Sequence, residues 1–122
     1  MSGHPLEKFR GDLKRLGAIS TADFKVTKQR EVRVGGVVTA LKLKNTKKGD
    51  RYATFSLEDW LGTVDAIVWP DTYRNVASTL GADDPVLVSG RADVSAERCA
   101  LIVEKIESLI ALRDRNATQG FL

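Results

Sequence analysis

The feature that most constrains the fold of this chain is an alternation of apolar and polar residues in short stretches between residues 32 and 106. In the stretch 52–58, Ala53, Phe55 and Leu57 share one parity, and more polar residues occupy the other. A period of two is typical of a strand that buries one face. The region as a whole predicts five short strands.

The first of these stretches changes parity partway along. Val32 and Val34 occupy even positions, whereas Leu41 and Leu43 occupy odd ones. A slip of one residue turns every following side chain to the other face, so an extra residue must be absorbed between the two halves. The Gly35–Gly36 pair lies there, and glycine is common at bulges. We therefore expect a bulge at Gly35–Gly36, in a long first strand that bends to serve both halves of a barrel.

A helical pattern interrupts the strands between the third and the fourth. Its apolar residues recur at intervals of three and four, at Tyr73, Val76, Ala77 and Leu80. Five strands with a helix after the third are the order of an OB-fold, a Greek-key barrel that binds oligonucleotides or oligosaccharides. The sequence thus predicts an all-β protein, a five-stranded OB-fold Greek-key barrel with accessory helices, in which this helix closes one open end.

The predicted barrel occupies residues 31–108, between two shorter segments. Residues 1–30 are predicted to form an N-terminal helix and a connector, and residues 109–122 the start of a further C-terminal segment. The helix carries an apolar stripe formed by Leu6, Phe9, Leu13 and Leu16. Because isolated short helices are marginal in water, we expect this stripe to dock on the barrel or on a neighbouring chain.

Length and composition narrow the class of protein. The 122 residues contain no apolar run near the roughly 18 that a membrane helix needs, which indicates one domain without a membrane span. Cys99 is the only cysteine and His4 the only histidine, so neither an internal disulfide nor a metal cluster is expected, and no cofactor is predicted. We expect Cys99 to be a buried strand residue in a reducing, cytoplasmic setting.

Charge is unevenly distributed, although the net charge is only +3. Residues 1–51 hold 13 lysines and arginines against 5 acidic residues, whereas residues 52–122 hold 6 against 11. A cluster of cations lies in and beside the predicted loop between the first two strands, at Lys42, Lys44, Lys47, Lys48 and Arg51. In OB-folds this loop borders the ligand face, so the cluster predicts contacts with a phosphate backbone. The alternative is a solvated basic surface.

Two aromatic residues are candidates for stacking on nucleic-acid bases. Tyr52 and Trp69 are expected to point outward from the second and third strands, and Thr54 lies on the same face. Thr54 offers little area for stacking, and Asp65 on this face repels phosphate. This face is also a candidate docking site for the N-terminal helix, which would then cover Trp69. The residues predict a weak site for a single strand.

Four short motifs follow one another along the chain. Ser2–Leu6 reads SGHPL, Thr46–Arg51 reads TKKGDR, and Leu57–Gly62 and Val64–Trp69 form a turn and the strand that follows it. In this order the motifs resemble the C-terminal region of the alpha subunit of bacterial DNA polymerase III, and the resemblance covers nearly the whole chain. It implies an OB-fold nucleic-acid-binding domain preceded by a short helix.

The resemblance also implies a function, a ligand and partners for this segment. It implies an excised fragment that is not itself an enzyme, because the catalytic residues of that family lie outside this region. It implies single-stranded DNA as the ligand. The rest of the polymerase alpha subunit and other holoenzyme subunits are the implied partners.

Two other functions stay open at this point. One is an RNA-binding OB domain of the kind that holds tRNA anticodons, which would read base edges from the outer face of the second and third strands. The other is a protein-interaction barrel within the polymerase holoenzyme. An enzyme is not favoured, since the chain has no histidine–nucleophile pair, metal-ligand cluster or glycine-rich phosphate loop. We expect a module that binds the phosphate backbone of single-stranded DNA, without sequence preference.

Overall fold

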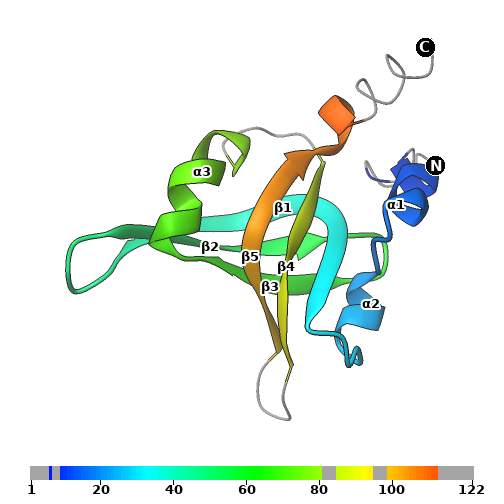
Figure 1. The fold of residues 1–122 in the computed structure, drawn as a ribbon, viewed down its shortest axis with the longest axis horizontal. Coiled ribbons are helices and arrows are strands. Elements are labelled where there is room, and N and C mark those ends of the chain that lie inside the picture. Colours follow the sequence, from blue (N-terminus) through cyan, green and yellow to red (C-terminus); the bar gives the residue numbers. More distant parts are fainter. Residues whose placement is uncertain (1–5, 7–8, 81–84, 95–98, 113–122) are drawn as a thin grey trace.

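The computed structural model describes residues 6, 9–80, 85–94 and 99–112, and shows strands curled into a barrel with helices around it (Figure 1). In chain order the elements are α1 (Arg10–Arg15), α2 (Thr21–Phe24), β1 (Glu31–Asn45), β2 (Arg51–Glu58), β3 (Thr63–Val68), α3 (Pro70–Leu80), β4 (Val86–Val94) and β5 (Cys99–Ser108). Residues 109–112 add a helical turn after β5. The SGHPL motif up to Pro5 and residues 113–122 lie outside the described residues.

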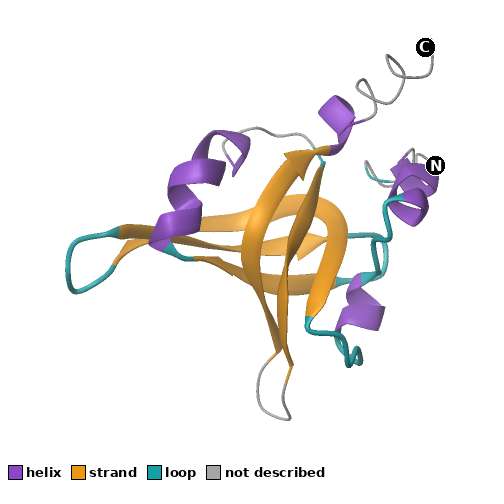
Figure 2. Ribbon diagram, viewed as in Figure 1, coloured by secondary structure: helices purple, strands orange, loops and turns teal. Residues whose placement is uncertain are grey.

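The strands close a barrel in the order β1-β2-β3-β5-β4 (Figure 2). All neighbours are antiparallel except β3 and β5, which are parallel. β1 serves both halves, because residues 31–36 pair with β4 and residues 37–45 pair with β2. The predicted five-stranded OB barrel is therefore confirmed. Figure 1 shows that the far end of the β1–β2 hairpin projects beyond the barrel wall.

The extra residue in β1 lies four residues later than the sequence predicted. Pairing through Gly35 and Gly36 is continuous, and the register shift occurs between Thr39 and Lys42, where Ala40 has φ 51°. The predicted bulge at Gly35–Gly36 is thus wrong in position. The inference of one extra residue was correct, since β1 changes parity across the shift.

Gly35 and Gly36 allow other parts of the chain to approach β1 closely, and neither has a backbone conformation that requires glycine. They lie where β1 changes its partner from β4 to β2, so other parts of the chain crowd against them. A Cβ on Gly36 would lie 2.6 Å from the carbonyl oxygen of Glu58, and one on Gly35 would overlap the side chain of Leu13. A side chain at either position would push apart the elements that meet there.

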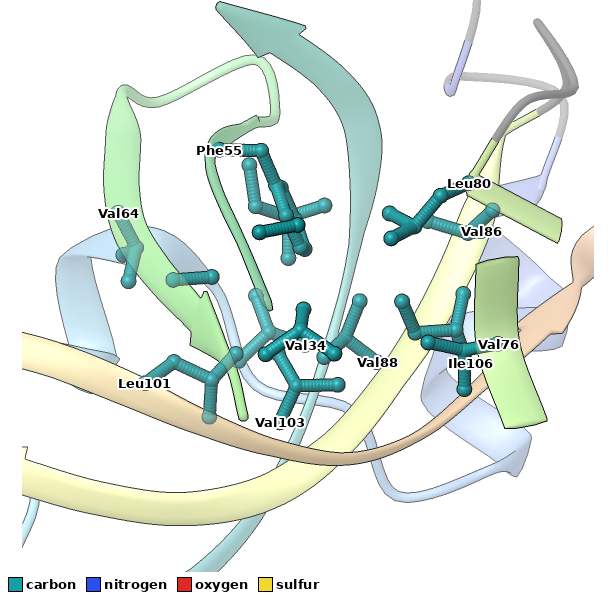
Figure 3. Close-up of a cluster of buried hydrophobic side chains, with 14 of the residues drawn as sticks. Val34, Phe55, Val64, Val76, Leu80, Val86, Val88, Leu101, Val103 and Ile106 are labelled. Carbon is teal, nitrogen blue, oxygen red and sulfur yellow. The ribbon is translucent and has the colours of Figure 1, made fainter. Parts of the chain in front are cut away.

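The barrel interior holds the main hydrophobic cluster (Figure 3). The inward residues predicted for β2, Ala53, Phe55 and Leu57, are 0–4% exposed. Val76 and Leu80 of α3 belong to the same cluster, so α3 closes one end of the barrel as predicted. Phe24 of α2 is also fully buried in this cluster, within the stretch that was predicted to be a connector.

A second, smaller cluster attaches the N-terminal segment to the barrel. Leu6, Phe9 and Leu13 are 0–6% exposed and pack with Leu87 of β4 and Leu109 after β5. The predicted docking of the N-terminal stripe is confirmed. The alternative in which this segment covers Trp69 is wrong, because Trp69 stays 46% exposed. The β2–β3 face is therefore open along the part of the chain that the structure describes.

Candidate nucleic-acid interface

A shallow groove of about 670 Å³ runs over the outer face of β2 and β3. One side is formed by β1 and the other by the ends of β4 and β5. The lining residues that bear on recognition are Lys42, Lys44, Thr54, Ser56, Asp65, Ile67, Trp69, Asp93, Cys99 and Ile102. We call this surface the outer groove.

Pairing between β1 and β2 brings two of the predicted cations onto the groove side. Lys42 lies opposite Thr54 and Lys44 opposite Tyr52, and paired residues of neighbouring strands share a face. Arg51 lies at the start of β2, opposite Asn45. All three cations are exposed. Lys42 and Lys44 therefore lie on the outer groove, whereas Arg51, which has the parity of Ala53 and Phe55, starts β2 on the other face of the hairpin.

The tip of the β1–β2 hairpin carries Lys47 and Lys48 in a compact turn. The backbone N–H of Thr46 donates to the carbonyl oxygen of Asp50 at 2.8 Å, and that of Asp50 donates to Oγ1 of Thr46 at 3.1 Å. Gly49 has φ 88°, a conformation that glycine adopts without strain. This turn leaves both lysine side chains exposed at the tip of the projecting hairpin.

Tyr52 and Trp69 form an aromatic pair at the same end of the groove as the cations. Their ring centroids lie 5.5 Å apart with an angle of 32° between the planes. Each ring thus restrains the other, and Tyr52 is half-buried. A base stacked on Trp69 would meet a surface that is already ordered.

The opposite end of the outer groove is acidic. Asp65 and Asp93 both line it, and the hydroxyl of Ser56 donates to Oδ1 of Asp65 at 3.5 Å. Their charges repel phosphate, whereas Lys42 and Lys44 at the other end attract it. The groove is therefore electrically asymmetric along its length.

Cys99 lies in this groove and is half-buried rather than buried, contrary to the prediction for a core strand residue. Partial burial raises the pKa of the Cys99 thiol, an effect that Lys25 opposes and Asp65 reinforces. A raised pKa keeps the thiol protonated at neutral pH, so Cys99 contributes an uncharged side chain to the groove wall.

Of the eight predicted site residues, Lys42, Lys44, Thr54 and Trp69 line the groove, and Tyr52 contacts Trp69. Lys47, Lys48 and Arg51 are not among the lining residues and lie at the tip of the β1–β2 hairpin and the start of β2. Asp93 and Ile102 could not be identified from the sequence, because Ile102 reaches the groove through the parallel pairing of β5 with β3, and Asp93 through the pairing of β4 with β5. Alternation along a strand gives no sign of which strands will be neighbours.

Two further properties of the described residues bear on function. No group of three or more histidine, cysteine, aspartate or glutamate side chains lies close enough to hold a metal ion. Among the helices that the structure describes, none is long and apolar enough to cross a membrane.

Comparison with known proteins matches the part of the chain that forms the barrel. Residues 32–109 match the family described as OB-fold nucleic acid binding domain. The DNA polymerase III subunit alpha of Aquifex aeolicus is 33% identical over 111 residues, and that of Bacillus subtilis is 28% identical over 108 residues. Each match covers 88% of this chain and 10% of the relative, so the chain spans about a tenth of the length of these polymerase subunits.

Solved structures share the fold at low sequence identity. Asparaginyl-tRNA synthetase from Pyrococcus horikoshii matches with a TM-score of 0.54 and 23% identity, over 75% of this chain and 22% of the synthetase. The SSB domain of a Synechococcus protein matches with a TM-score of 0.54 and 14% identity, over 66% of this chain and 97% of that domain. These likenesses support the barrel architecture alone.

Proposed function

This chain belongs to the family of OB-fold nucleic acid binding domains, and from that premise we propose that it binds single-stranded DNA along the outer groove. In this proposal the strand is held by its phosphates along Lys42–Arg51, with base stacking at Tyr52 and Trp69. The one observation that carries the proposal is the position of the aromatic pair, at the cationic end of the groove and uncovered by the N-terminal segment.

The chemistry of the groove favours a backbone-directed mode of binding. Lysine side chains on phosphates release condensed counterions and carry no information about base identity. Stacking on an aromatic ring is also tolerant of sequence, because every base has a π-face. Binding is therefore expected to show little sequence preference.

A single strand fits this arrangement better than a duplex. Trp69 offers its ring to an unpaired base, whereas the bases of a duplex are already stacked on one another and turned inward. The acidic end of the groove repels phosphate, which further limits how many phosphates of one strand the groove can bind. We expect a short contact and modest affinity.

The similarity to DNA polymerase III alpha subunits gives the proposal its setting. We propose that the domain holds single-stranded DNA beside a replicative polymerase whose catalytic residues lie elsewhere, in contact with the rest of that subunit and with other holoenzyme subunits. This role places the domain in the cytoplasm.

A fluorescence-anisotropy titration tests the proposal. Labelled oligo-dT, a mixed-sequence single strand, a matched duplex and an RNA strand of the same length are titrated with the chain at low salt. We expect the two DNA single strands to bind with similar affinity and the duplex to bind more weakly. Tighter binding of the duplex would contradict the proposal, and a clear preference for RNA would point to the RNA-binding alternative.

A further inference from the structure

A second concave surface lies at the other end of β2, away from the outer groove. It is a pocket of about 370 Å³ between α1, the connector that follows it and the β2–β3 turn. Tyr52 and Glu58 are six residues apart in β2, so the pocket lies roughly 20 Å along the strand from the aromatic pair of the outer groove. We call this surface the turn pocket.

One wall of the turn pocket is fixed by the buried carboxylate of Asp59, which is 5% exposed. Thr21 donates to it twice, from its backbone N–H at 2.9 Å and from its hydroxyl at 2.8 Å. The backbone N–H groups of Leu61 and Gly62 donate to the same carboxylate at 2.8 and 3.1 Å. The two bonds from Thr21 tie the β2–β3 turn to α2, and the other two order the turn itself, so the wall is preorganised.

The part of the turn pocket between α1, the connector and β1 is apolar. Leu13 packs against Gly35 there, and Ala18 and Ile19 are only partly buried. At the edge, Trp60 is 39% exposed and the neighbouring Leu61 is 59% exposed. A rigid pocket with this lining suits an aliphatic or aromatic side chain from another molecule.

The rim of the turn pocket is positive. Arg10 and Lys14 are exposed on α1, and the Arg10 guanidinium lies 5.1 Å from the ring centroid of Trp60. Among the described residues that line the pocket, Asp59 is the one carboxylate, and its oxygens accept the four hydrogen bonds from Thr21, Leu61 and Gly62. Asp12 of α1 is paired with Arg15 at 2.5 Å and does not line the pocket. Within the described part of the chain, the charge that the rim offers to a ligand is therefore that of Arg10 and Lys14.

We propose that the turn pocket binds an acidic peptide segment of a partner protein that carries an apolar anchor residue. The anchor side chain enters the apolar part of the pocket, and aspartates or glutamates next to the anchor in the peptide pair with Arg10 and Lys14. Nucleic acid fits less well, since the aromatic ring that lines the described part of the pocket, that of Trp60, already has the guanidinium of Arg10 against it. This inference goes beyond the proposed DNA binding and does not depend on it.

The two tryptophans of the chain allow each surface to be followed separately. Trp69→Phe leaves Trp60 as a fluorescent reporter in the turn pocket, and Trp60→Phe leaves Trp69 in the outer groove. The probe is a short synthetic peptide with a Leu-Phe pair flanked by aspartates. Its two controls replace the aspartates by asparagines, or the Leu-Phe pair by two alanines.

In the Trp69→Phe protein, the acidic peptide is expected to change Trp60 emission saturably, and both control peptides are expected to bind much more weakly. Arg10→Gln/Lys14→Gln should weaken binding of the acidic peptide by about fivefold, because two exposed ion pairs are lost. In the Trp60→Phe protein, the peptide should leave Trp69 emission unchanged.

Three results would overturn the inference. One is no response of Trp60 to the acidic peptide, and another is equal binding of the asparagine control. The third is a response of Trp60 to oligo-dT in place of the peptide, which would make the turn pocket an extension of a nucleic-acid surface.

Discussion

The two faces of β2 differ in what they contribute, although they alternate residue by residue. The inner face, with Ala53, Phe55 and Leu57, is buried in the barrel core and gives the strand its stability. The outer face, with Tyr52 and Thr54, is half-buried and lines or adjoins the outer groove. Because the two sets of side chains point in opposite directions, stability and ligand binding should be separable by single substitutions. The predictions below test that separation.

The largest effect is expected on the inner face. Phe55→Ala removes a buried aromatic ring and should lower the free energy of unfolding by about 3–5 kcal/mol. The neighbouring outer-face substitution Thr54→Ala is the matched control and should change it by less than about 0.5 kcal/mol. Urea titration followed by circular dichroism measures both. A loss below about 1 kcal/mol for Phe55→Ala would show that the strand had been assigned inside out.

The next effect is expected where β1 changes partner. Gly36→Ala places a Cβ against the carbonyl oxygen of Glu58 and should destabilise the fold by about 1–3 kcal/mol. Gly11→Ala is the control, because a Cβ at Gly11 meets nothing within 4 Å and alanine favours the helix. Urea titration of the two variants should therefore give shifts of opposite sign. Equal stability of Gly36→Ala and the wild type would remove the close-approach explanation.

Outer-face substitutions should affect binding and leave stability almost unchanged. Tyr52→Ala is expected to weaken single-stranded DNA binding by about 1–3 kcal/mol, largely independent of salt, because a stacking surface is lost. Tyr52→Phe keeps the ring and should bind nearly as well as the wild type. Anisotropy titrations at two salt concentrations check both. An effect of Tyr52→Ala that disappears at high salt would indicate an electrostatic role instead.

The smallest effect is expected at the acidic end of the outer groove. Asp65→Asn removes a charge that repels phosphate and should strengthen DNA binding by less than about 1 kcal/mol. Glu107→Gln lies outside the outer groove and serves as the control. The same anisotropy assay compares them. Weaker binding by Asp65→Asn would mean that this carboxylate accepts hydrogen bonds from the bases.

Sequence patterns could predict the features that depend on periodicity. The inward residues of β2, the apolar face of α3 and the docking stripe of the N-terminal segment all follow from spacing alone. The position of the bulge could not be read in this way, since parity shows that a residue is extra without showing where it is inserted. In the structure Ala40 has the positive φ at the bulge, whereas Gly35 and Gly36 lie where neighbouring atoms leave no room for a Cβ.

Contacts between distant parts of the chain were beyond the reach of the sequence. Asp59 appeared only as part of a turn motif, and its bonds to Thr21 depend on α2, a helix too short to show periodicity. Asp93 reaches the outer groove through the pairing of β5 with its neighbours. The predicted cations, by contrast, lie within one hairpin, so local sequence was enough to bring them together.

The salt dependence of DNA affinity tests the central claim most directly. Lys47→Ala/Lys48→Ala removes two cations from the hairpin tip, and each phosphate contact on a single strand contributes roughly 0.7 to the slope of log K against log salt. The slope should therefore shrink by about 1.4, equally for oligo-dT and mixed sequences. Arg10→Gln/Lys14→Gln removes the same charge from the turn pocket and should keep the wild-type slope. An unchanged slope for the Lys47/Lys48 variant would contradict backbone binding along the hairpin.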